Sequence, residues 1–126
     1  MINYPCVCCG HLTMGESPGS YEICSVCFWE DDPVQLRWPD WAGGANRPSL
    51  IGAQANFIRF GASEERFAAE VRPPRKDEPL DPNWRPVDLG RDFFERRGQR
   101  DAPWPEDCTV LYWWRYRDTG FWRRCG

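Results

Sequence analysis

The sequence has 126 residues, a formal net charge of −3, and 41% hydrophobic and 28% charged residues. A domain of this size can bury about two thirds of the surface that its unfolded chain exposes, and the composition excludes collagen, coiled coils and complete disorder. The longest apolar run, 110–114, is far shorter than the roughly 18 residues of a membrane helix. The first residues have neither the basic flank nor the apolar core of a signal peptide. We therefore expect one cytoplasmic domain.

The first half of the chain combines a cysteine-rich module with helices. Residues 12–14 and 21–23 are predicted strands, and the turn 15–20 joins them into a hairpin. Ser49 is a predicted N-cap for a helix that ends at Phe60, because Gly61 can adopt the left-handed stop. Ser63 caps a second expected helix, Glu64 to Val71.

The second half begins with a connector that contains five prolines, 73–86. A third helix is expected over 88–97, with Leu89, Phe93 and Phe94 turned inward. The segments 109–117 and 121–124 are predicted to form an aromatic β-hairpin. The expected architecture is a small α+β fold, in which a zinc-ribbon hairpin packs on short helices and a C-terminal helix and hairpin follow. Its parts are the cysteine-rich module 1–72, the connector 73–86 and the segment 87–126, packed together as one domain.

Four of the seven cysteines form two C-x-x-C pairs, Cys6/Cys9 and Cys24/Cys27. The two residues inside each pair allow a tight turn that aims both sulfur atoms at one point, and Gly10 suits the left-handed residue that closes such a turn. Two such turns predict one tetrahedral site for a structural Zn²⁺, because four thiolates leave no open position for catalysis.

Two neighbouring residues, Cys8 and His11, remain alternative ligands, and Cys8 is expected to pack beside the metal. Cys108 and Cys125 lie far along the chain and are expected to be free thiols. A redox role for either C-x-x-C pair is disfavoured because the surrounding sequence lacks a βαβ pattern.

No catalytic set can be assembled from this sequence. The chain has a single histidine, so we expect no Ser/His/Asp set, and the pair Cys8/His11 lacks a visible third group. Phosphate-binding and H-E-x-x-H motifs are absent as well. We therefore expect a protein that is not an enzyme.

Two clusters are candidates for contact with a partner. Residues 1–48 hold two arginines against six carboxylates, and three of these acids are adjacent, so they suit the basic surface of a partner protein. Local pairing or capping is the alternative use of these acids. Aromatic and arginine side chains of the C-terminal hairpin are residue types that anchor interfaces or stack on single-stranded bases, although they can also fill a core. The candidate residues are Glu30, Asp31, Asp32, Trp113, Arg115, Arg117 and Trp122.

The cysteine pairs and the residues around them resemble the bacterial cysteine-rich CPCC family. The resemblance covers about residues 4–76 and rests on the blocks 4–13, 19–32, 53–57 and 60–67, with Val7 where the family name has a proline. It implies a small zinc-binding bacterial protein, without an enzyme activity to carry over. By analogy, it is similar to the antitoxin-like proteins encoded beside polymorphic toxins.

Three functions follow as hypotheses. The first is a non-enzymatic zinc-binding protein-interaction module. Its specific form is an immunity protein that binds and neutralises a toxin with a basic domain. The second is a zinc-ribbon protein that binds nucleic acid, which the acidic charge disfavours. The third is a redox or metal sensor that uses Cys8 or Cys125.

Overall fold

The computed structural model describes residues 3–99 and 102–115. Its helical elements are α1 (Pro33–Arg37), α2 (Leu50–Phe60) and the 3-10 turns η1 (Glu65–Phe67), η2 (Cys108–Leu111) and η3 (Trp113–Arg115). Strand-like pairing in these residues is limited to three isolated antiparallel bridges, Tyr4–Met14, His11–Leu80 and Ile23–Glu30. The expected α+β fold with its N-terminal hairpin is therefore wrong. None of the helices in the described ranges combines the length and the apolar character needed to cross a membrane.

The N-terminal hairpin is absent because residues 12–14 and 21–23 pair with other partners. Met14 exchanges both backbone hydrogen bonds with Tyr4, at 2.7 and 3.0 Å, while Ile23 bridges to Glu30. Each cysteine turn is thereby closed by its own flanking residues. Their backbone groups are satisfied without a shared ladder.

Helix α2 confirms the predicted boundaries. The Ser49 side chain accepts a hydrogen bond from the backbone N–H of Gly52, and Gly61 adopts φ 77° while its N–H bonds the carbonyl of Phe57. A polar N-cap and a left-handed C-terminal residue satisfy backbone groups that a helix leaves open at its ends. The helix buries Leu50, Ala53 and Gln54.

Helix α1 was not predicted, although its start follows a familiar rule. Asp32 caps it by accepting a hydrogen bond from Val34, and Pro33 occupies the first helical position. Proline suits that position because its missing N–H has no partner in the helix and its φ is already helical. The Asp-Pro pair was therefore a readable signal inside a segment that was expected to be irregular.

The two other expected helices do not form. Over 64–71 only η1 is present, because the chain is tied to the second cysteine turn at both ends: Ser63 N–H donates to the Cys27 carbonyl and Arg72 N–H to that of Ser25. Over 88–97 there are only turns. Of the three residues expected to face inward, Leu89 and Phe93 are 67% and 57% exposed, and only Phe94 packs against the core, partly buried. A stripe that stays exposed supplies no burial energy to stabilise a helix.

The aromatic segment near the C-terminus is not a strand. Residues 108–115 form η2 and η3, and these bury the consecutive side chains Tyr112, Trp113 and Trp114. A strand would turn neighbouring side chains to opposite faces, whereas the 3-10 turns bring all three into the core. The rest of the predicted hairpin, 116–126, lies outside the described residues.

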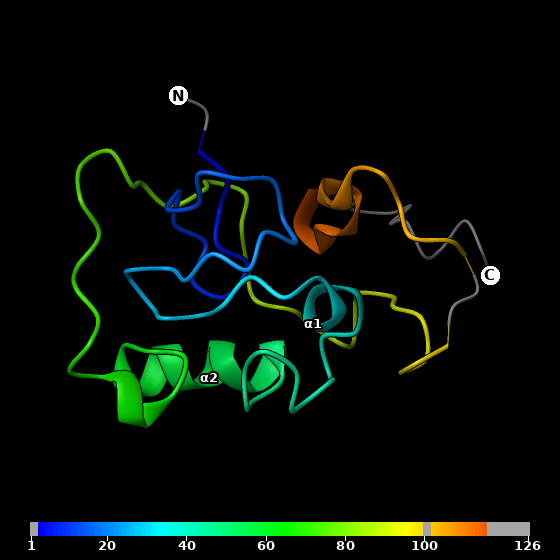
Figure 1. Cartoon of the computed structure of the whole chain (residues 1–126), viewed down its shortest axis with the longest axis horizontal. Coiled ribbons are helices and arrows are strands. Elements are labelled where there is room, and N and C mark those ends of the chain that lie inside the picture. The colour runs from blue at the N-terminus through cyan, green and yellow to red at the C-terminus, as the bar shows by residue number, and fades with distance from the viewer. Residues whose placement is uncertain (1–2, 100–101, 116–126) are drawn as a thin grey trace.

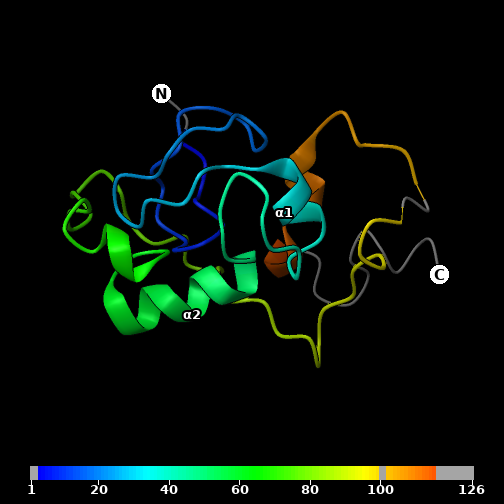
Figure 2. The same cartoon turned by 60° about the horizontal axis from the view of Figure 1, so that its bottom comes forward.

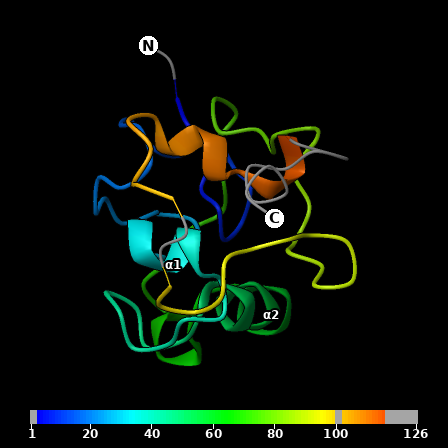
Figure 3. The same cartoon turned by 90° about the vertical axis from the view of Figure 1, so that its right-hand side faces the viewer.

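The core lies between two helical regions. Figures 1 and 3 show α2 along one side of the molecule and the segment 108–115 on the opposite side, with α1 between them. The cysteine turns, Trp29 and Leu36 belong to the same buried cluster as Leu50 and Tyr112. In Figure 2 the chain after residue 85 starts beside α2 and runs along the side of the molecule that carries α1. The cysteine module and the following segment therefore share one core.

A buried ion pair fixes α1 to the segment after residue 87. Arg37 is fully buried, its Nε lies 2.5 Å from Oε1 of Glu95, and a second hydrogen bond of 3.0 Å makes the pair bidentate. The guanidinium also lies over the rings of Trp38 and Trp104, at 5.1 and 4.6 Å from their centroids. A buried arginine needs this arrangement, since an unpaired charge in the core is strongly unfavourable.

The substitution Glu95→Gln tests this pair. We expect it to lower the free energy of unfolding by about 3–5 kcal/mol, because it leaves the buried Arg37 charge uncompensated. The exposed Glu106→Gln is the control and should change it by less than about 0.5 kcal/mol. Urea unfolding followed by tryptophan fluorescence measures both, and equal stability of the two variants would contradict the assignment.

Candidate metal centre

The first cysteine turn runs from Cys6 to His11 and is closed by backbone hydrogen bonds. Gly10 N–H donates to the Cys6 carbonyl at 2.7 Å, and Cys6 N–H donates to the His11 carbonyl at 2.8 Å. Gly10 has φ 81°, which confirms the predicted left-handed residue. Glycine adopts this conformation without the steric cost that a Cβ would add.

The second turn, Cys24 to Trp29, repeats this geometry. Phe28 N–H donates to the Cys24 carbonyl at 2.7 Å, and Cys24 N–H donates to the Trp29 carbonyl at 2.9 Å. Phe28 therefore stands where Gly10 stands in the first turn, with φ 70°. Its ring packs on Phe67 at a centroid distance of 4.6 Å. The sequence analysis did not predict a left-handed conformation for Phe28, although Phe28 directly follows its C-x-x-C pair, as Gly10 does.

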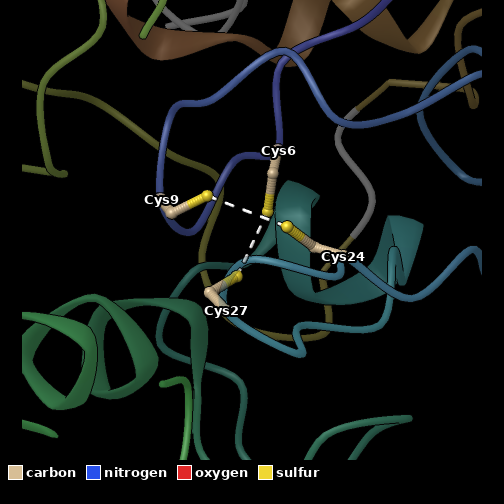
Figure 4. A group of neighbouring side chains, drawn as sticks. All are labelled: Cys6, Cys9, Cys24 and Cys27. Atoms are coloured by element: carbon tan, nitrogen blue, oxygen red, sulfur yellow. Dashed lines mark hydrogen bonds between the residues drawn. The ribbon is translucent and has the colours of Figure 1, made fainter. Parts of the chain in front are cut away.

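The two turns bring four thiols together in the interior. The Sγ atoms of Cys6, Cys9, Cys24 and Cys27 all lie within 4.8 Å of one another. Two pairs are joined in Figure 4: Cys6 and Cys27 at 3.5 Å, and Cys9 and Cys24 at 3.8 Å. A tetrahedral ion with metal–sulfur bonds of about 2.3 Å needs sulfur separations of about 3.8 Å. The four predicted ligands are thus positioned to hold a metal ion.

Burial sets the charge state of the cluster. It raises the pKa of the Cys6 and Cys27 thiols well above the ordinary value. Hydrogen bonds from Cys27, then from Cys6 and Cys9, lower the pKa of Cys24, while the bond to Cys24 raises that of Cys9. Four thiolates together require a bound cation, which links metal binding to proton release.

The other candidate ligands stay outside this cluster. Cys8 is fully buried but is not among the four converging thiols, and His11 instead bonds the Glu78 carbonyl through Nδ1 at 2.9 Å. Because a carbonyl only accepts, that nitrogen carries the proton. Cys108 is a half-buried free thiol, and Cys125 lies outside the described residues.

One hydroxyl contacts the cluster directly. Thr13 Oγ1 lies 3.1 Å from Cys24 Sγ. This bond stabilises the thiolate form of Cys24, whose lowered pKa it helps to produce. Such outer contacts orient metal ligands and tune their basicity.

The segment 72–84 crosses both cysteine turns (Figure 1). It is attached to the second turn through Arg72, whose N–H donates to Ser25, and to the first through Leu12 N–H, which donates to the Pro79 carbonyl. Between these points Glu78 accepts two hydrogen bonds from the Arg72 guanidinium, at 2.6 and 2.9 Å. Arg72 is the main cause that lowers the Glu78 pKa to about 2. The carboxylate therefore stays charged, and the segment stays pinned, across the pH range in which the thiols can bind metal.

The first turn is also covered at close range. The position that a Cβ on Gly10 would occupy lies 2.5 Å from Cδ2 of Trp84 and 2.8 Å from Cδ1 of Leu80. Asp81 N–H donates to the Gly10 carbonyl at 2.8 Å, and Trp84 Nε1 donates to the Val7 carbonyl at 3.2 Å. A side chain at residue 10 would displace this covering layer.

The structure gives internal roles to two of the three adjacent acids. Asp31 is 4% exposed and accepts hydrogen bonds from Gly19 N–H and from the N–H and hydroxyl of Ser20. Asp32 is 5% exposed, and besides capping α1 it accepts from the Ala45 N–H. Glu30 is half-buried. Of these three predicted partner contacts, only Glu30 has a side chain within reach of solvent.

The aromatic candidates separate in the same way. Trp113 is 6% exposed and donates through Nε1 to the Arg85 carbonyl, so it serves the core. Arg115 is exposed, with its guanidinium 4.8 Å from the centroid of the buried Tyr112 ring. Arg117 and Trp122 lie outside the described residues.

Comparison with known proteins gives one family. The family described as Cysteine-rich CPCC matches residues 4–78, which include both cysteine turns and most of the segment that crosses them. No curated protein matches the chain.

Replacing Thr13 with the isosteric valine tests the outer contact. We expect Thr13→Val to weaken metal binding about tenfold, because the Cys24 sulfur loses its hydroxyl donor. Competition with a chromophoric chelator measures the affinity. Thr109→Val removes a hydroxyl remote from the thiols, so it should leave the affinity unchanged; a tenfold loss in that variant too would contradict a specific role for Thr13.

The covering of the first turn is tested at Gly10. Gly10→Ala should lower the free energy of unfolding by about 2–4 kcal/mol, through the left-handed backbone and the clash with Trp84 together. Gly43 has the same φ of 81° but open space around it, so Gly43→Ala should cost only about 1 kcal/mol. Thermal or urea unfolding measures both variants. Equal losses of stability in Gly10→Ala and Gly43→Ala would contradict a close contact of Trp84 and Leu80 with residue 10.

Proposed function

The chain belongs to the cysteine-rich CPCC family, and we propose that it is a non-enzymatic protein-interaction module built on one structural Zn²⁺. The ligands are Cys6, Cys9, Cys24 and Cys27. The observation that carries the proposal is the convergence of these four buried thiols within 4.8 Å. The interaction role is the further step, and it takes its support from the chemistry of the site and of the surface.

Zinc is the ion that this donor set suits best. Four soft thiolates at tetrahedral separations favour Zn²⁺ over hard cations, which prefer oxygen ligands. Two C-x-x-C turns are also the common framework of structural zinc sites. Bound zinc supplies the positive charge that the buried thiolates require, and it contributes its binding free energy to folding.

The same donor set argues against catalysis at the metal. A catalytic zinc keeps one position for water or substrate, whereas four protein thiolates occupy all positions. The single histidine of the chain bonds a backbone carbonyl. A binding role therefore accounts for the site better than an enzymatic one.

An immunity protein for a bacterial toxin is the specific form of the binding role that we propose. The chain is acidic overall, with a sequence pI of about 5.2, and two thiolate pairs on one Zn²⁺ add further negative charge. An acidic surface suits a basic partner, such as a nuclease domain, because complementary charge raises the rate and specificity of association. The same acidity disfavours nucleic acid as the ligand, and the burial of Cys8 disfavours this residue as the reactive thiol of a sensor.

The metal assignment is tested by cysteine substitution. Each of Cys6→Ser, Cys9→Ser, Cys24→Ser and Cys27→Ser should lose bound zinc and fold poorly, since three thiolates bind the ion far less tightly. Cys8→Ser, Cys108→Ser and Cys125→Ser should each keep one zinc per chain. Native mass spectrometry and elemental analysis count the metal, and a full complement in Cys24→Ser would refute the ligand set.

The binding role is tested by isolating the tagged protein from nuclease-treated lysate of its native host. One stoichiometric basic protein, encoded by a neighbouring gene, is the expected companion. Recovery of nucleic acid alone, and only when the nuclease is omitted, would replace the proposed role with nucleic-acid binding.

A further inference from the structure

An exposed apolar patch lies beside the second cysteine turn. Tyr21 and Ile23 are 52% and 50% exposed, and Ile23 bridges to Glu30 on the far side of the turn. The Phe28 ring lines the same pocket as Ile23 and packs on Phe67. We call Tyr21, Ile23, Phe28, Glu30 and Phe67 the second-turn face.

The backbone of this face is strained at its aromatic residues. Tyr21 and Phe28, with φ 62° and 70°, are the non-glycine residues at positive φ in the described part of the chain. Phe28 gains its contact with Phe67 in return. Tyr21 gains no comparable contact: within the described ranges its hydroxyl has no hydrogen-bond partner and its ring stacks on no other ring. A strained aromatic side chain that faces solvent suggests a function outside the fold.

A pocket of about 200 Å³ opens within this face. Its lining includes Ile23, Phe28 and Phe67 as apolar walls and Glu30 and Glu64 as acids. Arg66 also lines it, pairs with Glu64 at 2.9 Å, and places its guanidinium 4.2 Å from the Phe67 ring centroid. The chain's own Arg66 thus shows that one aromatic wall and one carboxylate of this pocket can hold a guanidinium.

The remaining charge of the pocket is negative. Arg66 and Glu64 compensate each other, whereas no hydrogen bond or ion pair within the described residues engages the Glu30 carboxylate. The field extends to Tyr21: partial burial raises its pKa, and Asp32, Glu30 and Asp31 raise it further. A cationic side chain would complement this field.

We propose that the second-turn face is the docking surface of the module, and that its pocket receives an arginine side chain of a basic protein partner. The guanidinium pairs with Glu30 and packs on the Phe28 ring, beside the Phe67 ring that Arg66 already covers, while Tyr21 and Ile23 cover apolar surface around it. Arginine suits this site better than lysine, because its planar group combines a bidentate carboxylate contact with stacking on aromatic faces. The inference rests on the proposed interaction function and adds to it the surface and the chemistry of the partner.

The probe is a short synthetic peptide, Ac-Gly-Arg-Gly-Arg-Gly-NH2, compared with the same peptide carrying citrulline in place of arginine. Citrulline keeps the shape of the side chain and removes its charge. Titration is followed by NMR on the zinc-loaded full chain labelled at isoleucine methyl groups. Ile23 reports on the face, and Ile58, which is 78% exposed on α2, is an internal control for non-specific contact.

We expect the arginine peptide to shift the Ile23 methyl signal with an affinity about fivefold higher than that of the citrulline peptide. The Ile58 signal should stay in place, and added salt should weaken the binding because exposed charges are screened. Equal affinities for the two peptides, or a shift centred on Ile58, would overturn the proposal. A single-stranded oligonucleotide that moved Ile23 at lower concentration than the peptide would also overturn it.

Two variants act in opposite directions. Glu30→Gln should abolish the preference for arginine over citrulline, whereas the exposed Glu70→Gln should preserve it. Arg66→Ala should strengthen binding of the arginine peptide several-fold, because it frees Glu64 and the Phe67 ring, and damage to the fold would not produce a gain. Unchanged selectivity in Glu30→Gln, or weaker binding in Arg66→Ala, would contradict the pocket assignment.

Zinc content measured on the same samples tests the metal centre separately from the docking surface. One zinc per chain with no arginine-specific shift refutes the docking surface and leaves the metal centre standing. If both are right, the cysteine variants lose the Ile23 response and the zinc together, whereas Glu30→Gln loses the preference for arginine and keeps one zinc per chain.

Discussion

Four thiols within 4.8 Å of one another, closed off from water, are the constraint on which the structure depends. Like charges cannot gather in a buried space without a compensating cation, so the two cysteine turns are stable neighbours only when a metal holds them or when most of the thiols keep their protons. The backbone hydrogen bonds that close each turn lie within that turn and do not join it to the other turn. The relative position of the turns is therefore the quantity that a metal would fix.

The rest of the chain is attached to these turns rather than to a sheet. Segment 72–84 binds to both of them, and α2 reaches the first through Gln54, which donates to the Val7 carbonyl and accepts from Val87 N–H. The segment 108–115 is held through indole groups that donate to Arg85 and Asp81. Single backbone hydrogen bonds and hydrogen bonds from side chains thus join the segments in place of strand ladders.

Local signals were readable in the sequence, and long-range ones were not. The Ser49 cap, the Gly61 stop and the left-handed Gly10 follow from backbone chemistry within a few residues, and the spacing of the cysteines is enough to group them. The pairing of Tyr4 with Met14, the burial of Asp31 beneath the 15–20 turn and the ion pair of Arg37 with Glu95 depend on which distant segments meet. Alternation and amphipathic spacing predicted strands or helices over 12–14, 21–23, 64–71, 88–97 and 109–117, but in the described part of these segments competing tertiary bonds determined the backbone.

The residue after each C-x-x-C pair is where the two turns differ most, Gly10 in the first and Phe28 in the second. In the first turn the aromatic ring comes from outside, since Trp84 presses against a residue that has no side chain. In the second turn the ring belongs to the turn itself, as Phe28, and the neighbouring η1 receives it. The two contacts are inverse solutions to one packing problem, so exchanging Gly10 and Phe28 would leave one turn with two rings in the same space and the other with none. Because of this difference, the two turns cannot exchange places along the chain, even though their backbones are alike.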